Sequence, residues 1–421
     1  MKAVGQTQLG VRRRAGSLLV LGLAIRECFS FWTGHPTDFE LWVRLGYAVT
    51  HGGDPYGLLQ WVPGLSFANV FGSSNAPTIA YLPFWPLLTG LIYLVYAAIG
   101  WDNRFFYYFL LKQPVIFADV GLAFLMFSFV YSRKPERAFW VLSFWLFSPF
   151  TIIISGIWGM FDSIAISLVF LSITSMSQTK RVLWEAVAIL AKSIPIIYAA
   201  PLTMKRLRDV WYALISIALA SLLSLITFLA MHWPLSLAVA TVGSTAVTGG
   251  SSMSAWDVLS YMNYLGYLPT LSLPVYQALG ILWVPALMLF TWIGVKRFGT
   301  QGEYGLFQSL LVCTLIFLIF KARITEQYAL YLFAISAIDV ALWNQTRKST
   351  LFGSVVVAMI YLLMNNYFLI RFLSPVYPGF VNFENAASLT IGGIRFACTF
   401  LAGTLFTCLN VKYLVDVLRK R

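Results

Sequence analysis

The chain has 421 residues, a length that would suit two or three soluble domains. Its composition excludes them, because 59% of the residues are hydrophobic and 11% are charged, whereas soluble domains carry about 25% charged residues. The net charge of +13 lies in short basic clusters between apolar runs, as is typical of cytoplasmic loops, and this pattern excludes nucleic acid as the partner. We therefore expect an all-α, polytopic membrane protein surrounded by a lipid bilayer.

Apolar runs of about 20 residues are long enough to cross the hydrocarbon core of a bilayer. The chain contains about twelve such runs, at 15–33, 78–99, 105–131, 138–155, 157–178, 182–204, 210–231, 276–295, 303–320, 327–344, 351–373 and 388–411. An even number of spans places both termini on one side, and the arginines near both ends predict that this side is cytoplasmic. Residues 1–14 and 412–421 then form the cytoplasmic ends, and the segments 34–77 and 232–275 form two long outer loops.

Two short basic loops conflict with this scheme. Residues 133–137 and the pair Lys180-Arg181 would also lie outside, against the positive-inside rule. Either one of the third to sixth spans is placed wrongly, or helix packing overrides the charge rule there. The side of the membrane on which Asp162 lies stays open for this reason.

The first outer loop contains the strongest signal of a functional site. Asp38 and Glu40 begin an amphipathic stretch that continues to Thr50, is too short to span and predicts a helix lying along the membrane surface. A helix N-terminus favours carboxylates, so a purely structural alternative makes Asp38 the N-cap and Glu40 a solvated neighbour. A turn at 52–56 follows, with Asp54 and Tyr56.

Further charged residues lie within or beside apolar runs, where function is the default interpretation. Asp162 follows two glycines between two apolar segments, and its structural alternative is a helix N-cap. Lys192 precedes a helix-breaking proline and either lines a polar cavity or extends to the interface. Lys112 and Asp119 are seven residues apart on one helical face and are expected to point into the bundle.

The loop at 321–328 carries two cations at the membrane surface. Lys321 and Arg323 make a phosphate-binding site plausible, and an ordinary basic loop is the alternative. Because the predicted topology puts this loop outside, against the charge rule, function is favoured. Glu326, Gln327 and Tyr328 complete the segment.

These segments, in this order, resemble the GT-C membrane glycosyltransferases, and most of all the catalytic subunit of the GPI mannosyltransferase I (the PIG-M family). The resemblance covers the first 205 residues and then the 320s. It rests on the acidic pair Asp38-Phe39-Glu40, the tyrosine- and proline-containing stretch 80–88, Ser148-Pro149 with 159–163, the lysine-proline stretch 192–198, and 321–328. Residues 15–231 would form the GT-C module with its catalytic loop at 34–77, and 276–411 a second transmembrane module.

The resemblance implies a hexosyltransferase that moves a sugar, expected to be mannose from dolichyl phosphate mannose, onto a lipid-linked or glycan acceptor with inversion, as in GPI-anchor biosynthesis. Asp38 would be the general base, and Glu40 would bind a sugar hydroxyl or assist Asp38 as the base. Lys321, Arg323 and Lys192 would bind the donor phosphate. The supporting or substrate-binding residues would be Arg44, Asp54, Tyr56, Asp162, Glu326, Gln327 and Tyr328.

The same resemblance implies an active site on the non-cytoplasmic side, in the endoplasmic reticulum of a eukaryote or the plasma membrane of a prokaryote. No cofactor is required, although a divalent cation held by Asp38 and Glu40 stays open, as does a small membrane partner subunit. The competing interpretations are a secondary transporter or flippase of a lipid-linked or amphipathic substrate, and a non-catalytic protein of the same fold. The acceptor is not identified by the sequence.

Overall fold

Our computed structural model describes residues 2–66, 76, 81–237, 239, 252–258 and 280–419, without the side chains of 2–9, 384, 385, 388 and 389. The protein is 81% helical and its described part has no β-strand. The only strand-like pairing there is an isolated bridge between Leu59 and Ala76. The fold is therefore all-α, as expected.

The first half of the bundle contains α1 (Lys2–Ser30), α2 (Pro36–Thr50), α3 (Phe84–Ile99), α4 (Arg104–Tyr131), α5 (Pro135–Phe147), α6 (Pro149–Ile152), the π-helix η1 (Ile153–Trp158), α7 (Asp162–Thr174) and α8 (Gln178–Ala191). The short helices η2 (Ile194–Tyr198), α9 (Ala199–Thr203) and η3 (Leu207–Asp209) lead to α10 (Val210–Ala230). The second half contains α14 (Trp283–Phe298), α15 (Gly302–Phe320), η4 (Glu326–Tyr328), α16 (Ala329–Leu342), η5 (Gln345–Arg347), α17 (Lys348–Asn365), η6 (Tyr367–Leu373) and α18 (Gly379–Arg419).

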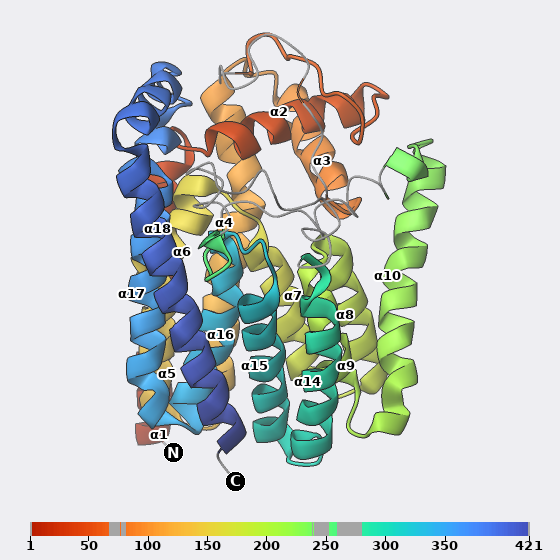
Figure 1. The fold of residues 1–421 in the computed structure, drawn as a ribbon, viewed down its shortest axis with the longest axis vertical. Coiled ribbons are helices and arrows are strands. Elements are labelled where there is room, and N and C mark those ends of the chain that lie inside the picture. Colours follow the sequence, from red (N-terminus) through yellow and green to blue (C-terminus); the bar gives the residue numbers. More distant parts are fainter. Residues whose placement is uncertain are drawn as a thin grey trace.

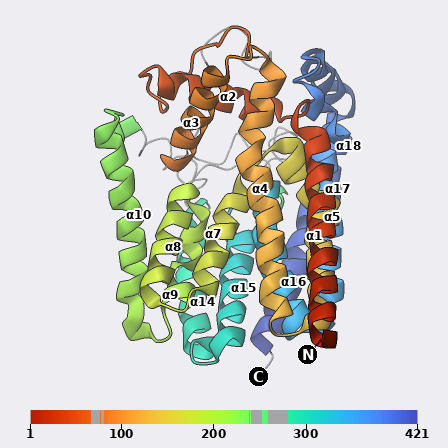
Figure 2. The same cartoon turned by 180° about the vertical axis from the view of Figure 1, so that it is seen from behind.

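The long helices run side by side, and α2 lies across one end of them (Figure 1). Both termini lie at the opposite end, as the view from behind also shows (Figure 2). We call these the α2 end and the terminal end. The helix predicted to lie along a membrane surface thus forms, and it crosses the bundle axis.

Five helical stretches of the described part are long and apolar enough to cross a membrane, and a sixth is added if the bent pair Pro135–Phe147 and Pro149–Trp158 counts as one span. The five are Arg104–Tyr131, Leu207–Ala230, Gly302–Phe320, Gln345–Asn365 and Thr390–Arg419. The protein is accordingly a helical membrane protein. The helices of the described part do not confirm the predicted number of twelve spans.

The segment 78–99, predicted to be a membrane span, instead forms a helix that packs on α2. Its helix α3 packs on α2 at the α2 end and does not continue into the rest of the bundle (Figures 1 and 2). The contact is close because of Gly46, where an added Cβ would lie 2.8 Å from the carbonyl oxygen of Thr89. Apolar composition alone does not distinguish a helix that crosses the membrane from one that lies on α2.

The predicted span 182–204 is also different, because it contains a reversal of the chain. Helix α8 ends at Ala191, with Lys192 as its C-cap, and Pro195, which has no backbone N–H to donate, stands in the first turn of η2. The chain then returns through α9, so that Gln178 Nε2 donates a hydrogen bond to the Thr203 carbonyl at 2.5 Å. The loss of 78–99 lowers the number of crossings by one. The reversal within 182–204 changes that number by one again, so both termini stay at one end.

These two corrections remove the conflict over the basic loops. Arg133, in the α4–α5 turn, donates to Glu303 at the start of α15, and Arg137 donates to the Ala341 carbonyl at the end of α16. Arg181, after α7, also lies in the electrostatic field of Glu303. The basic turns that violated the charge rule therefore lie at the terminal end.

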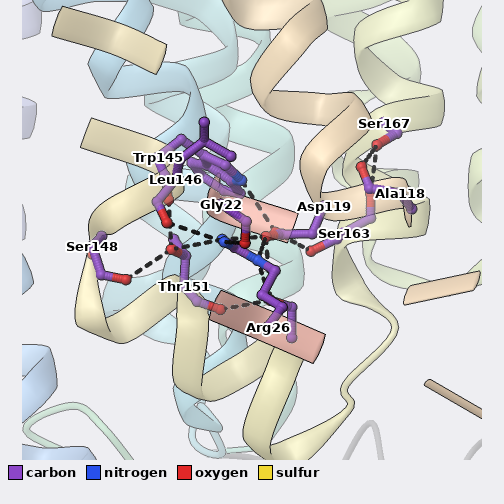
Figure 3. A network of polar contacts seen from close by, with 11 residues as sticks. Gly22, Arg26, Ala118, Asp119, Trp145, Leu146, Ser148, Thr151, Ser163 and Ser167 are labelled. Carbon is purple, nitrogen blue, oxygen red and sulfur yellow. Dashed lines mark hydrogen bonds and ion pairs between the residues drawn. The ribbon is translucent and has the colours of Figure 1, made fainter. Parts of the chain in front are cut away.

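Four helices meet at a buried ion pair, shown in Figure 3. Arg26 of α1 donates through Nε to Asp119 of α4 at 2.6 Å, and neither side chain is exposed. Asp119 also accepts from Ser163 of α7 at 2.7 Å and from Trp145 of α5 at 3.1 Å. The prediction that Asp119 points into the bundle is confirmed, whereas its partner Arg26, inside the first apolar run, was not anticipated.

The same network fixes the π-helix η1. The Arg26 guanidinium donates to Ser155 Oγ at 3.1 Å, and Ser155 donates to Asp119 at 3.2 Å. Lys112, equally buried, donates from Nζ to Thr33 Oγ1 at 2.8 Å and to the carbonyls of Gly156 and Ile157, both at 3.0 Å. Two buried cations of the core thus bind groups on this one irregular turn.

We predict that Asp119→Asn destabilises the protein strongly. The variant leaves the Arg26 charge buried without its counter-ion, which costs about 3–5 kcal/mol. Thermal unfolding of the purified protein in detergent measures the loss. Glu303→Gln is the matched control, because its half-exposed pair with Arg133 contributes at most about 1 kcal/mol. Equal losses in the two variants would contradict a special role for Asp119.

The corrected chain direction predicts opposite accessibility for two exposed positions. Met176, in the α7–α8 turn, is 100% exposed, and Leu58, after α2, is 67% exposed. In a protein whose four cysteines are replaced by serine, a membrane-impermeant maleimide should label Met176→Cys and Leu58→Cys from opposite sides of a sealed vesicle. Labelling of both positions from the same side would support the twelve-span topology predicted from the sequence.

Candidate functional site

A cavity of about 550 Å³ lies where α2 meets the end of the bundle. Side chains from widely separated parts of the chain line it. The residues predicted for the site that do so are Asp38, Lys192, Lys321, Arg323, Glu326, Gln327 and Tyr328. The fold thus brings together the acidic start of the first outer loop, the lysine-proline turn and the loop after α15.

Asp38 stands at the third position of α2, and the cap of that helix is another residue. His35 is the N-cap, and its ring Nδ1 accepts a hydrogen bond from the Asp38 backbone N–H at 3.2 Å. Burial and the charge of Arg371 hold the pKa of His35 well below its usual range. The imidazole is therefore a neutral acceptor. The alternative in which Asp38 caps the helix is wrong, because His35 does so.

The carboxylate of Asp38 is held from the π-helix. Trp158, the last residue of η1, donates its indole N–H to Asp38 Oδ2 at 3.0 Å, and its ring stacks on His35 with 4.7 Å between the centroids. The Asp38 side chain keeps 22% of its surface exposed. Burial raises the pKa of this carboxyl group, while the bond from Trp158 and the charges of Arg371, Lys192 and Arg323 oppose that rise.

Lys192 has a partner that the sequence did not reveal. Its Nζ lies 2.6 Å from Asp162 Oδ2, and the carboxylate is fully buried. Asp162 occupies the first position of α7 without capping it, which excludes the N-cap alternative. Because Lys192 lines the cavity of Asp38, Asp162 lies at the α2 end, on the same side of the bundle as the first loop. Asp162 compensates the Lys192 charge.

Lys321 and Arg323 are two cations of the cavity for which the described residues provide no acidic partner. Lys321 follows the last residue of α15, and its Nζ lies 5.6 Å from the centroid of the Trp283 ring. Burial and the neighbouring charge of Arg323 lower the pKa of Lys321 to about 8. Arg323 is exposed to the cavity. A bound anion would stabilise two like charges held close together without a counter-ion.

Amide and carboxylate groups form a further part of the wall. Glu326 accepts from the side-chain amides of Asn365 at 2.6 Å and Asn366 at 3.2 Å. The Oε1 atom of Gln327 is buried and has no hydrogen-bond partner in the described part of the chain. Tyr328 packs nearby, with its ring 5.5 Å from Lys192 Nζ. Such a wall offers acceptors and donors suited to hydroxyl groups.

The other predicted site residues lie apart from the cavity. Glu40 is fully buried and accepts from Arg44 Nε at 2.8 Å, because two positions along a helix turn its side chain away from Asp38. Asp54 accepts the backbone N–H of Tyr56 at 2.8 Å in a turn, and the Tyr56 hydroxyl donates to the Tyr81 carbonyl at 2.9 Å. The acidic pair Asp38 and Glu40 therefore does not act as one unit.

Several residues of the cavity were missed by the sequence reasoning. Arg371, Asn365 and Asn366 lie inside the predicted span 351–373, where polar side chains are a functional signal that could have found them. Trp158 and His35 carried no comparable signal, since their roles depend on the position of Asp38 across the fold. Among the described residues, no group of three or more His, Cys, Asp or Glu could hold a metal ion.

The cavity has a charged part and an apolar part. Trp283, Phe317 and Ile197 line the latter together with Ile196, which is 39% exposed on the outside of η2. With Lys192 compensated by Asp162, the described charged residues of the wall are three cations (Lys321, Arg323 and Arg371) and two carboxylates (Asp38 and Glu326). The balance favours an anionic ligand with an apolar portion.

No protein-family model matches the chain, and a search of the curated proteins finds no match.

Proposed function

We propose that the protein is a membrane glycosyltransferase of the GT-C type that moves a sugar, expected to be mannose, from a polyprenyl phosphate donor to a lipid-linked or glycan acceptor. The observation that carries this proposal is the single cavity in which the carboxylate of Asp38 and the cations Lys321 and Arg323 meet. The first supplies a base and the second an anion site, and sugar transfer from a lipid phosphate requires both.

Asp38 is the proposed general base. A sugar hydroxyl is a poor nucleophile and attacks more readily if a positioned carboxylate takes its proton. Trp158 fixes one oxygen of Asp38, and no contact of the described residues engages the other, so that it can accept this proton. Attack on the face opposite the phosphate breaks the anomeric C–O bond with inversion, and the electron pair leaves on the phosphate oxygen.

Lys321 and Arg323 stabilise the negative charge that develops on that phosphate. Cations fixed in a largely buried site are more effective than cations in water, because they need not reorganise during the reaction. Lys192 contributes less than predicted, since Asp162 compensates its charge. We assign this pair to positioning η2 against the buried ring of Phe161, whose centroid lies 4.8 Å from the Lys192 ammonium.

The apolar part of the cavity suits the prenyl chain. Trp283 and Phe317 lie beside Lys321, so a lipid phosphate bound there would have its chain next to these rings. Glu326, Gln327 and Asn365 would contact sugar hydroxyls. We assign Glu40 to stabilising α2 through its ion pair with Arg44. Whether transfer requires a divalent cation is left open.

The positions of the basic turns support an orientation with the terminal end in the cytoplasm. The cavity then opens on the non-cytoplasmic side, in the endoplasmic reticulum of a eukaryote or the plasma membrane of a prokaryote. A position at one end of the bundle favours an enzyme over the alternative transporter, whose site is expected near the bilayer midplane. An acidic motif in the first outer loop is also what the GT-C resemblance implies.

The first test is transfer from dolichyl phosphate mannose by the purified protein in lipid, with a glycolipid extract as acceptor. We predict that Asp38→Asn lowers kcat at least a hundredfold, which is the contribution of a positioned base. Asp102→Asn is the matched control, because this exposed carboxylate at the start of α4 contacts Tyr96 and does not line the cavity. Unchanged transfer by Asp38→Asn would exclude the catalytic role.

The pH dependence provides a second test. Asp38 loses its function as the pH falls through its raised pKa, and Lys321 loses its charge as the pH rises through about 8. We therefore expect a bell-shaped profile of kcat/KM with an alkaline limb near pH 8. Lys321→Arg keeps the cation at all accessible pH values, so it should move the alkaline limb upward by more than one pH unit. A limb that stays in place belongs to another group.

A further inference from the structure

A second pocket, of about 360 Å³, lies at the terminal end, far from the cavity of Asp38 along the chain's long helices. The start of α17 and the end of α18 form it. Its lining consists of Thr346, Arg347, Thr350, Lys412, Asp416 and Arg419. None of these residues takes part in the proposed reaction, and the inference drawn from them is independent of it.

Arg347 is buried at the base of this pocket and is only partly saturated. Its Nη1 donates to Asp339 and to Gln308, both at 2.9 Å, and its Nη2 donates to the Asp416 carbonyl at 2.8 Å. The side chain is 1% exposed, yet its Nε–H has no acceptor among the described residues. Because Nε is itself buried, Arg347 forms the floor of the pocket and does not contact a ligand directly.

Helix α18 presents cations above Arg347. Lys412 and Arg419 are both exposed and seven residues apart, so they share one face of the helix. Leu405, seven residues before Lys412 on that face, is 56% exposed. The face therefore changes from apolar to cationic toward the terminal end. Asp416, one turn after Lys412, reduces the positive charge of the pocket.

We propose that this pocket binds the phosphate of an anionic phospholipid headgroup. The two segments that form it, Gln345–Asn365 and Thr390–Arg419, are both long and apolar enough to span, and the pocket lies at their ends, where headgroups lie in a bilayer. Lys412 and Arg419, which are both exposed, would contact the phosphate above Arg347. An acyl chain would extend along Leu405, which a soluble anion would leave exposed.

The test measures lipid binding to the full-length protein by native mass spectrometry in a neutral detergent, with dioleoyl phosphatidylglycerol and dioleoyl phosphatidylcholine as probes. We expect the phosphatidylglycerol affinity of the double variant Lys412→Gln/Arg419→Gln to fall at least tenfold. The matched control is Lys205→Gln/Arg208→Gln, which removes one lysine and one arginine from another turn of the terminal end and should change it less than twofold. Asp416→Asn should raise the affinity.

Four outcomes decide the proposal. Equal losses in the two double variants would overturn it, because general surface charge would then explain the binding. Equal affinity for the two lipids would also overturn it. Competition by millimolar inorganic phosphate alone, without any lipid preference, would assign the pocket to a soluble anion instead. Since the exchanged side chains are exposed, unchanged melting temperatures should show that the variants are folded, and a selective loss on that background supports the lipid site.

Discussion

The ion pair between Arg26 and Asp119 is the constraint on which the rest of this structure depends. A guanidinium and a carboxylate enclosed in an apolar bundle are costly unless each finds several partners. Arg26 meets this requirement by binding α4, α5 and the π-helix, and Asp119 by binding α5 and α7. The pair therefore fixes three helices, α4, α5 and α7, relative to α1. It also fixes η1, whose last residue, Trp158, holds the carboxylate of Asp38. The core network and the candidate base are joined through one irregular turn.

The same physical rule separates structural charges from functional ones. Asp162 compensates Lys192, and Asp339 compensates Arg347. Glu40 and Arg44 form a third such pair inside the first loop. In the cavity of Asp38, Lys321 and Arg323 have no acidic partner among the described residues and are then available to a ligand. A sequence alone identifies only charged residues in apolar runs. A charged residue that has no ion-pair partner in the fold indicates a site more reliably.

The elements of the fold could be predicted further than their connections. Apolar length predicted α4, α10 and α15 to within one residue at each end, because a continuous hydrophobic run specifies a helix in a membrane. The predicted span 351–373 ran eight residues past the end of α17 and into η6. Apolar length failed at 78–99 and at 182–204, since neither the packing of α3 on Gly46 nor the reversal at Lys192 is written in hydropathy. Asp38 was found because a carboxylate beside an apolar segment is conspicuous. Trp158 and His35 were not, since their importance arises from contacts across more than a hundred residues or from an unusual cap.

The position of Asp38 shows why a paired acidic motif can mislead. On an α-helix, residues two apart point in nearly opposite directions. One member of Asp38-Phe39-Glu40 can face the cavity only if the other faces the interior of the loop, where Arg44 meets it one helical turn later. A motif of two acids therefore combines a reactive group with the ion pair that anchors the helix carrying it. Removing Glu40 should disturb the position of Asp38 without removing a reacting atom, and this separates a loss of fold from a loss of chemistry at one short segment.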